Sequence, residues 1–407
     1  MRKVSDFNKL WVGQSVSLLG SALTTFALPS LAVLVLHATA VQLGILTALQ
    51  TLPFPILGMF VGVLADRLSR RKIMIVADLV RFALLATIPL SAWLGVLQMP
   101  QLYAVSLLSG IASAFFGITY QSYLPAVVPT ERLTDANMKL EFSNSGSNMA
   151  GNALGGLLIQ TIGAPAAIAV DAFSYVISVL TLAQIRTPEL PHDGPRLTLQ
   201  QGIAEMREGL KIVFHSSDLR WILGGTATTN FGGAMIGAVN LIFAYRILHL
   251  QPGPLGLVYG IAEIGFIGAL LSTRVRMIFG LRATLAGSLF LGALGLAAML
   301  FAQLGAPYIV LFASCAVVAI SIPIYNVNQI SYRQALVDLK LQGRMNATIR
   351  TFVWGTLPFG ALVGGYLGGA LGVQATIAIG AAICAGAALW LLPLRERPNA
   401  FDSGGMV

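Results

Sequence analysis

The sequence predicts an all-α polytopic membrane protein with twelve transmembrane helices in two pseudo-symmetric six-helix bundles. Three observations support this: the composition, the spacing of apolar runs and the placement of positive charge. Of the 407 residues, 56% are hydrophobic and only 10% are charged, and the mean hydropathy is +0.79. A soluble domain carries about 25% charged residues because its surface faces water. The outer surface of this chain must therefore face lipid.

Apolar runs long enough to cross a bilayer recur along the whole chain. A span needs about 20 mostly apolar residues, and only helices satisfy every backbone N–H and C=O within one segment. The first run is too long for the apolar part of a signal peptide, about 7–15 residues, so we expect it to be a retained helix. The expected spans are residues 10–36, 41–64, 73–97, 101–125, 138–162, 164–183, 219–248, 254–272, 283–304, 307–330, 347–369 and 372–394.

Positive charge alternates between the loops. All but two of the 25 Lys and Arg residues lie at the termini, in the loops after spans two, four, six, eight and ten, or in the first few residues of the spans that follow these loops; the exceptions are Arg81 and Arg246. Cytoplasmic loops are enriched in Lys and Arg. We therefore expect a multi-pass protein of the cytoplasmic (inner) membrane with both termini in the cytoplasm. The topology explains the net charge of +9, and no nucleic-acid partner is expected.

The longest polar stretch divides six spans from six. We expect an N-terminal six-helix bundle over residues 1–184, a cytoplasmic linker over 185–218 and a C-terminal six-helix bundle over 219–407. The second part of the linker has apolar residues at helical spacing, which predicts an amphipathic helix lying along the membrane surface and joining the two halves. The apolar positions are Leu199, Ile203, Met206, Leu210 and Val213.

The chain also repeats itself at an offset of 209 residues. Residues 126–158 and 335–367 share 8 identities in 33 aligned positions, where this composition gives roughly 3 by chance. Four of the pairs are glycines of one register, including Gly151/Gly360 and Gly155/Gly364. Six-plus-six repeats are typical of secondary transporters, which hold substrate near the membrane midplane between the halves. The duplication predicts a carrier.

The most specific motif joins spans two and three and reads Gly62-Val-Leu-Ala-Asp-Arg-Leu-Ser-Arg-Arg-Lys72. It resembles the signature loop of the major facilitator superfamily, G-x-L-a-D-R-x-G-R-R/K, with Ser69 in place of a glycine. The resemblance implies a loop that locks the two halves on the cytoplasmic side. That inner-gate role would fall to Gly62, Asp66, Arg67 and Arg71. The alternative is a basic loop that only sets orientation.

The resemblance covers essentially the whole chain and is closest to the macrolide-efflux and siderophore-exporter branch. It is carried by residues 7–20, 78–81, 171–175 and 333–344. The chain departs from proton-coupled drug antiporters in two places. Span four lacks the arginine that many of them carry, and Asn152 stands where the antiporter motif has proline.

Charged residues inside the spans are candidates for function, because each costs about 2.5–3.5 kcal/mol near the midplane on insertion scales. Glu263 is the deepest and is the candidate proton-coupling group; the alternative is a glutamate hydrogen-bonded between helices. Asp78 and Arg81 are three residues apart, which predicts an intramembrane ion pair of structural role. Asp171 and Glu141 lie nearer the ends of their spans, and we expect both to be structural.

Polar and aromatic residues within the spans could line a substrate cavity. Each alone is as well explained by helix packing. As a set they favour a roomy, largely apolar cavity for a bulky amphipathic molecule. The candidates are Phe115, Phe116, Tyr120, Asn144, Asn148, Asn230, Asn240, Tyr325, Asn326 and Trp354, with Asn328 beside them.

Several classes of protein are excluded or weakened by what the sequence lacks. It has no G-x-x-x-x-G-K-[ST], no H-E-x-x-H and no G-x-S-x-G, so neither an ATP motor nor an enzyme is expected. We expect no cofactor and no metal. The two cysteines, Cys315 and Cys384, lie far apart in apolar runs and form neither a disulfide framework nor a thiolate site.

The function predicted is therefore export of amphipathic small molecules, as in drug or macrolide efflux, by alternating access. Proton-coupled antiport in a monomer, with substrate, protons and the lipid bilayer as partners, is the expectation. Export of an endogenous metabolite such as a siderophore, and uptake by proton symport, stay open. A channel is less compatible with the duplication and the lone Glu263.

Overall fold

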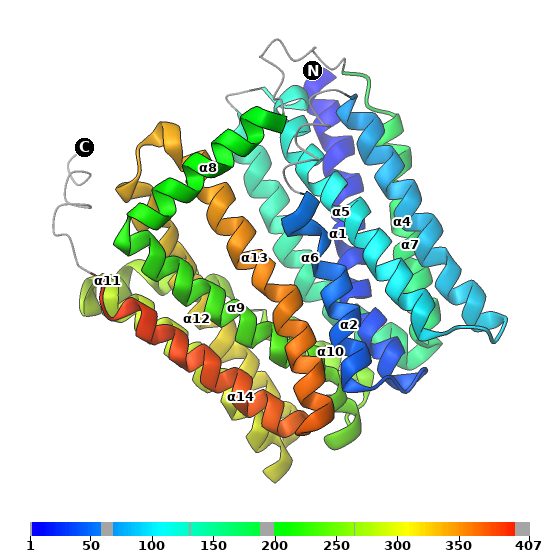
Figure 1. Cartoon of the computed structure of the whole chain (residues 1–407). Coiled ribbons are helices and arrows are strands. Elements are labelled where there is room, and N and C mark those ends of the chain that lie inside the picture. The colour runs from blue at the N-terminus through cyan, green and yellow to red at the C-terminus, as the bar shows by residue number, and fades with distance from the viewer. Residues whose placement is uncertain (1, 58–67, 130–131, 188–198, 264, 395–407) are drawn as a thin grey trace. The chain divides into compact units, whose positions relative to one another are not determined.

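The computed structural model describes residues 2–57, 68–129, 132–187, 199–263 and 265–394. Within these ranges every regular element is a helix (Figure 1). The chain forms two compact units, each of which is described by itself below. An all-α fold built of apolar helices, as the sequence predicts, is confirmed.

The first unit comprises Met1–Leu199 and Ala244–Ile261. Within it α1 packs along α6 and α7, α4 packs along α5 and α7, and α2 packs on α5. Figure 1 shows α1, α4, α5 and α7 running side by side in this unit. Its helices are α1 (Arg2–Leu34), α2 (Ala40–Thr51), α4 (Arg70–Trp93), α5 (Met99–Val127), α6 (Leu133–Ile162), α7 (Ala164–Ala183) and α10 (Pro252–Ala262), of which the last residue belongs to the second unit.

The second unit comprises Gln200–Phe243 and Ala262–Val407. Within it α9 packs along α13 and α14, and α11 packs along α12 and α14. A positive φ of 77° at Gly280 breaks α11 into two helical pieces, a conformation that glycine adopts readily. Its helices are α8 (Leu199–His215), α9 (Ser217–Ile242), α11 (Gly265–Ala298), α12 (Pro307–Leu336), α13 (Leu339–Ala370) and α14 (Val373–Gly386). A π-helical turn, Phe243–Ile247, follows α9, and 3₁₀ turns cover Met299–Leu304 and Ala387–Leu391.

The sequence repeat is visible in the backbone. Helix α5 ends at Val127 and α12 ends at Leu336, the same offset as in the sequence. The residues that follow, Val128 and Val337, have nearly the same conformation (φ −120°, ψ 135° and φ −127°, ψ 132°). Gly163 and Gly372 precede α7 and α14 with φ values of 87° and 91°, where glycine is favoured. The two units are structural copies over these helices.

The repeated glycines serve the same purpose in both copies. A Cβ atom at Gly151 on α6 would lie 2.5 Å from the Cβ of Ala22 on α1. A Cβ atom at Gly360 on α13 would lie 2.4 Å from the carbonyl oxygen of Phe231 on α9. Membrane helices associate without a hydrophobic driving force, so small residues that allow close backbone approach matter greatly. The glycine pairs thus bring α6 onto α1 and α13 onto α9.

The number of spans stays a prediction. Among the described residues, nine helical runs are long and apolar enough to cross a membrane, and one of these, Pro252–Leu304, holds two of the predicted spans. The helices α6 and α13 are not among the nine, because both begin with polar residues and carry several Asn, Ser or Thr side chains. Part of the second predicted span, residues 58–64, lies outside the described residues.

The division into bundles is likewise still a prediction. The compact units divide the chain differently, because the segment Ala244–Ile261 joins the first unit. Its contacts explain this: Tyr245 Oη lies 2.9 Å from Ser30 Oγ, and the ring of Tyr259 packs edge-on against Phe26 of α1. Gly256 approaches Gly156 of α6 so closely that a Cβ atom would lie 2.7 Å from its Cα.

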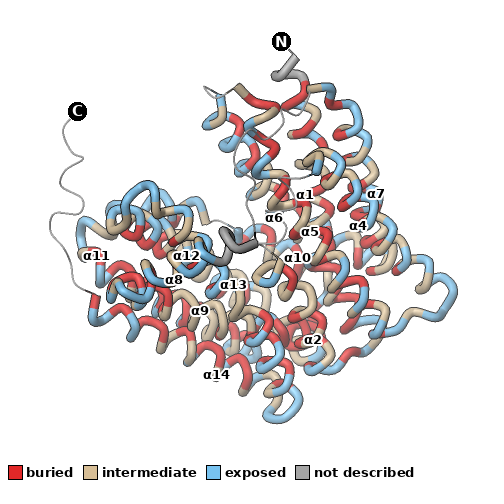
Figure 2. The backbone as a smooth tube through the Cα atoms, turned by 45° about the horizontal axis from the view of Figure 1, so that its top comes forward, coloured by how far each residue is buried: buried red, intermediate tan, exposed pale blue. Residues whose placement is uncertain are grey.

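Burial follows the faces of the helices within each unit (Figure 2). Buried side chains line the surfaces where neighbouring helices meet, whereas many large apolar side chains point outward, as expected of a surface that faces lipid. The repeat also organises the cores. Phe116, Tyr123, Leu182 and Ile185 lie in the core of the first unit, and their counterparts at the repeat offset, Tyr325, Tyr332, Leu391 and Leu394, lie in the core of the second.

The predicted amphipathic helix of the linker is present as α8 and docks on α13. Val213 is buried among Leu219, Met345 and Ile349, while Met206 is 44% exposed although the pattern placed it on the apolar face. Arg344 on α13 pairs with Glu208 and, at 3.4 Å, with Glu205. These ion pairs connect α8 with the first turns of α13.

We expect Gly209→Ala to loosen α8 far more than Arg344→Gln does. A Cβ atom at Gly209 would lie 2.6 Å from the carbonyl oxygen of Arg344, a backbone atom that cannot yield easily. The ion pairs of Arg344 are more than a third exposed, and such pairs contribute about 0–1 kcal/mol. The rate of tryptic cleavage after Arg207, an exposed residue of α8, measures the loosening. Equal rates in the two variants would contradict the role given to Gly209.

We expect Gly360→Ala to destabilise the second unit by about 1–3 kcal/mol, because the added methyl group overpacks the α9–α13 contact. Gly343 provides the matched control on the same helix, since a Cβ atom there meets nothing within 4 Å. Thermal unfolding in detergent should show a lowered Tm for Gly360→Ala and an unchanged or raised Tm for Gly343→Ala. A fall of the same size in both variants would instead indicate a general effect on helix α13.

Candidate functional site

The predicted pair of Asp78 and Arg81 is present and deeply buried on α4. Arg81 Nη2 donates a hydrogen bond to Asp78 Oδ1. Asp78 is 0% exposed and Arg81 6% exposed. The second carboxylate oxygen of Asp78 and the Nε of Arg81 have no hydrogen-bond partner among the described residues. The pair therefore satisfies only part of its hydrogen-bonding capacity, which is costly away from water.

A second carboxylate faces the same arginine from α7. Asp171 is 0% exposed; its Oδ1 accepts a hydrogen bond from Ser174 Oγ at 3.0 Å, and its Oδ2 has no partner in the described part of the chain. Asp171 interacts electrostatically with both Arg81 and Asp78. The sequence analysis placed Asp171 near a span end and did not connect it to the pair. Asp171, Tyr175, Ser178 and Leu182 follow a helical spacing on one face of α7, but this spacing does not show which helix the face contacts.

Aromatic rings complete the surroundings of Arg81. The guanidinium carbon lies 4.6 Å from the ring centre of Phe116 on α5 and 4.4 Å from that of Tyr175 on α7. Such cation–π contacts contribute about 2 kcal/mol when desolvated. Tyr120 stacks on Phe116 with ring centres 6.1 Å apart. We name Asp78, Arg81 and Asp171, with the rings of Phe116 and Tyr175, the charged cluster.

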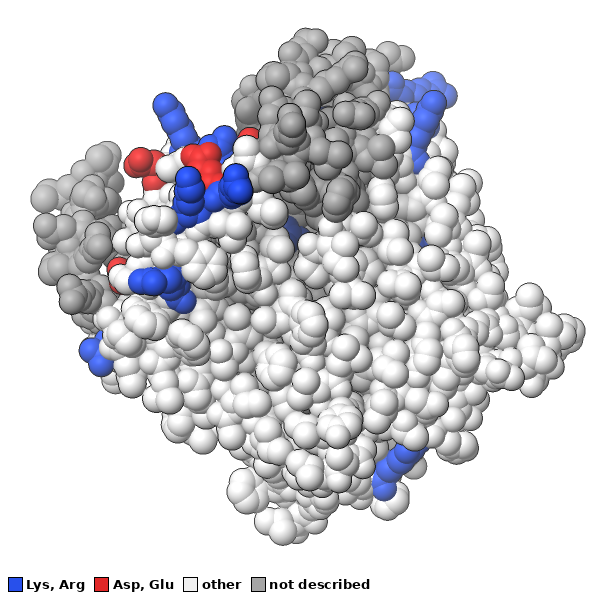
Figure 3. All heavy atoms as spheres, viewed as in Figure 1, with Lys and Arg blue, Asp and Glu red and all other residues white. Residues whose placement is uncertain are grey.

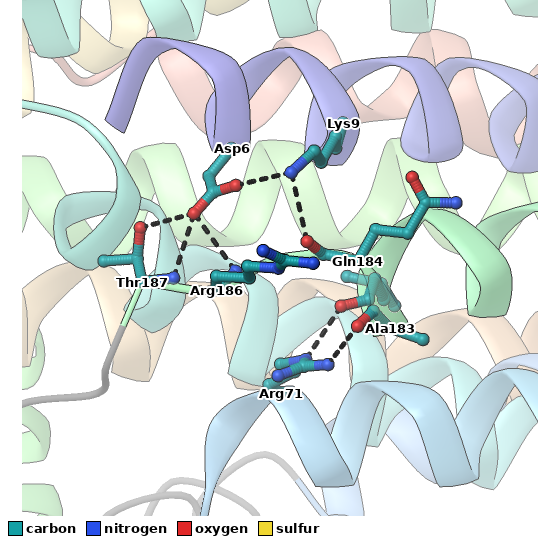
Figure 4. Close-up of polar contacts among 8 residues, drawn as sticks. Asp6, Lys9, Arg71, Ala183, Gln184, Arg186 and Thr187 are labelled. Atoms are coloured by element: carbon teal, nitrogen blue, oxygen red, sulfur yellow. Dashed lines mark hydrogen bonds and ion pairs between the residues drawn. The ribbon is translucent and has the colours of Figure 1, made fainter. Parts of the chain in front are cut away.

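The inner-gate motif is described only in part. Gly62, Asp66 and Arg67 lie outside the described residues. Arg71, on the first turn of α4, donates hydrogen bonds to the carbonyl oxygens of Leu182 and Ala183 (Figure 4). These carbonyls end α7, where backbone acceptors lack helical partners and the helix dipole is negative. Arg71 thus fastens α4 to the end of α7 within the first unit, and its part in a gate stays a prediction.

A buried carboxylate beside Arg71 ties the first helix to the chain that leaves α7 (Figure 4). Asp6 Oδ2 accepts hydrogen bonds from the backbone N–H of Arg186 at 3.1 Å and of Thr187 at 2.9 Å, and from the Thr187 hydroxyl at 2.7 Å. Asp6 Oδ1 accepts a bond from Lys9 Nζ at 2.9 Å. Asp6 is not predicted from the sequence, because no local pattern connects it with Arg186 and Thr187, which come much later in the chain.

Glu263 directly follows the last residue of α10. Helix α10 ends at Ala262, Glu263 itself is not helical, residue 264 lies outside the described residues and α11 begins at Gly265. Its side chain is exposed and has no hydrogen bond or ion pair with another described residue. Glu263 interacts electrostatically with the thiol of Cys315 on α12. Interrupted helices at membrane depth are typical of ion and substrate sites in transporters. The proton-coupling role remains a prediction.

The cavity candidates of the first unit differ in exposure. Phe116 is buried in the charged cluster, Tyr120 packs beside it and Phe115 is half-buried. On α6, Asn144 is half-buried and Asn148 is exposed. Asn144 and Asn148 on α6 are therefore accessible to a ligand, whereas Phe116 packs against Arg81.

In the second unit the candidates are mostly engaged with neighbouring helices. Asn230 Nδ2 donates to the Val353 carbonyl at 3.4 Å. Tyr325 is buried against Thr226, and Asn328 Nδ2 donates to the Ser272 and Ile324 carbonyls. Asn240 and Asn326 are half-buried. Trp354 is half-buried too, and Arg350 lies 4.2 Å from its ring centre. None of these contacts tests substrate binding, so the cavity set stays a prediction.

Charged side chains avoid most of the visible surface (Figure 3). In that view Lys, Arg, Asp and Glu gather over α8, and most of the remaining face is uncharged. Among the residues that the structure describes, no group of three or more His, Cys, Asp or Glu side chains could hold a metal ion.

The duplicated helical units, the apolar exterior and the charges buried within a unit define a membrane transporter of the major facilitator fold. The comparisons agree. Residues 2–403 match the family described as transmembrane secretion effector, and the chain belongs to this family of the major facilitator superfamily. Its members are transporters and not enzymes, as the sequence predicts.

Relatives and solved structures give the same assignment. The chain is 26% identical over 387 residues to macrolide efflux protein A of Streptococcus pyogenes, with 90% of each chain covered. It is 30% identical over 394 residues to the multidrug efflux pump Tap of Mycobacterium tuberculosis, covering 93% of this chain and 91% of the relative. A bacterial homologue of the iron transporter ferroportin superposes with a TM-score of 0.78 at 15% identity, over 97% of this chain and 99% of the other. That last likeness concerns the fold alone.

We expect Asp6→Ala to lower the free energy of unfolding by about 1–3 kcal/mol, because two partly buried backbone N–H groups lose their acceptor. Lys9→Gln serves as the control, since it removes only a partly exposed ion pair and one bond to the Gln184 carbonyl. Thermal unfolding of the two purified variants measures the difference. A Lys9→Gln effect as large as that of Asp6→Ala would show that the ion pair, and not the amide contacts, holds the junction.

Proposed function

We propose that this protein exports amphipathic small molecules across the cytoplasmic membrane by alternating access, coupled to proton entry. The observation that carries the proposal is the similarity, over about nine-tenths of both chains, to relatives named for macrolide and multidrug efflux. The composition supports it, because a chain with 10% charged residues offers a largely apolar binding surface.

The duplicated fold supports alternating access. Each of the two repeated units is held together by its own glycine contacts, as expected of a carrier in which one repeat moves as a rigid body against the other. The charge pattern of the sequence supports cytoplasmic termini, and with that topology export would carry substrate from the side of α8 to the opposite side.

The proton would bind at intramembrane carboxylates. Glu263 stands at the break between α10 and α11, where its exposed side chain could exchange protons with a water-filled cavity. Two alternatives are kept: export of one endogenous metabolite such as a siderophore, and uptake by proton symport. The fold is compatible with each of them.

Retention of a panel of compounds in expressing cells tests the proposal. Macrolides, cationic dyes and siderophores are each loaded with and without a protonophore. We expect at least one amphipathic compound to be retained less, and the protonophore to abolish the difference. If expression leaves the retention of the drugs and dyes unchanged and a siderophore is exported, export of an endogenous metabolite replaces drug efflux as the proposed function. Greater accumulation of any compound would favour uptake.

We expect Glu263→Gln to abolish proton-driven export while ligand binding remains measurable, because glutamine keeps the shape of the side chain but cannot carry the proton. Glu141→Gln is the matched control: Glu141 is an exposed carboxylate near the start of α6. Transport in proteoliposomes with an imposed pH gradient compares the two variants. Unchanged transport by Glu263→Gln would remove Glu263 from the coupling mechanism.

A further inference from the structure

The second unit serves as an internal control for the charged cluster, because it repeats the same helices. On α4 the buried residues are Met74, Ala77, Asp78, Arg81, Leu85 and Ile88. When Met74 is aligned with Leu281, the same spacing along α11 again falls on buried residues: Leu281, Thr284, Leu285, Ser288, Gly292 and Gly295. This match of burial, which uses an offset of 207 residues instead of 209, aligns Leu285 with Asp78 and Ser288 with Arg81; neither is charged.

The same comparison applies to α7 and α14, which follow the offset of the sequence repeat. Asp171 corresponds to Gly380 and Tyr175 to Cys384, and all four are buried. Gly380 packs against Gly232 and Ile236 of α9. At these aligned positions the second unit therefore has apolar or small residues in place of the charged ones.

Packing does not require the charges of the first unit. Replacing a buried ion pair by apolar residues is often neutral or stabilising, and burying charges in a membrane protein is expensive. Charges retained in one copy, where the other copy packs without them, indicate a function other than holding the helices together.

The charge balance of the cluster points to a bound proton. Two fully buried carboxyl groups face one guanidinium group, and Arg81 donates its hydrogen bond to Asp78. Among the described residues Asp171 Oδ2 has no hydrogen-bond partner, and Oδ1 accepts one hydrogen bond, from Ser174 Oγ. A third, unneutralised charge in a fully buried position would be strongly destabilising. One proton on Asp171 neutralises the cluster and leaves the Asp78–Arg81 pair intact.

We propose that Asp171 is a proton-binding site of the first helical unit, with Arg81 as the group that responds when the proton leaves. The groups facing Asp171 come from three helices. They are Asp78 and Arg81 on α4, Thr24 and the backbone of Gly20 on α1, and Ser174 and Tyr175 on α7. On α5, the ring of Phe116 contacts Arg81, and Tyr120 stacks on Phe116.

Loss of the proton would change the contacts between helices. The O–H bond of the Asp171 carboxylic acid breaks, the proton passes to water, and Asp171 becomes a carboxylate that competes with Asp78 for Arg81. Because Asp78 belongs to α4 and Asp171 to α7, the competition acts on the α4–α7 contact. This inference deepens the proposed function and rests on it only for the use of the proton, since a proton can be detected without transport.

Infrared difference spectroscopy of the full-length protein in lipid vesicles tests the site directly. The C=O stretching band of a protonated carboxylic acid, shifted in D₂O, reports the proton in the absence of substrate. We expect the band in the wild type, its loss in Asp171→Asn and its persistence in Glu263→Gln. A band unchanged in Asp171→Asn would overturn the proposal, as would a band that only Glu263→Gln removes.

A second variant separates function from folding. Asp78→Leu combined with Arg81→Ser and Asp171→Gly introduces the residues that α11 and α14 carry at the equivalent positions. We expect this variant to fold, with a Tm near that of the wild type, and to lack the band. Failure to fold would show that the charges are structural and would overturn the inference. The spectroscopic result stands whether or not the retention assay detects export, so the two proposals can fail separately.

Discussion

Close contact between helix backbones, made through glycine, is the constraint on which both units depend. Lipid offers no hydrophobic drive for helices to associate, so contact must be gained by bringing backbones near one another. Gly151 does this for α6 on α1, and Gly360 does it for α13 on α9. The other helices pack around these two pairs, and the two copies share even the backbone conformations that end and begin their helices.

The two units share this scaffold, but the charged cluster of the first unit has no charged counterpart at the aligned positions of the second. Gly20 illustrates the dependence, since a Cβ atom there would lie 2.3 Å from Asp171 Oδ1. The space for a buried carboxylate is thus provided by a glycine on the neighbouring helix. The fold tolerates the charged cluster because the close packing around it is already secured by small residues. The charged cluster is in this way confined to one copy, although the helices are common to both.

The sequence predicts the class of fold well, because apolar length and charge placement report directly on the bilayer. It also predicts the duplication and the contact of Asp78 with Arg81, since both rest on fixed spacings. It does not predict that Asp171 joins Arg81, because that contact depends on how α7 rotates against α4. Glu263 is a second case that the sequence does not predict. The apolar run that contains it does not show that α10 ends at Ala262, directly before Glu263. Local patterns do not contain such tertiary information.

The Asp6 junction has a consequence for how the chain folds as it is made. Asp6 and the Thr187 amide are 181 residues apart, so this contact has a very long sequence separation. At a synthesis rate of about 5–20 residues per second, roughly 9 to 36 s pass before the partner of Asp6 exists. Helix α1 must wait in the membrane for that interval, held by the helices made after it. The junction can then close before α9 and the later helices emerge from the ribosome, so α1 is joined to the end of α7 before Ala244–Ile261 completes the first unit.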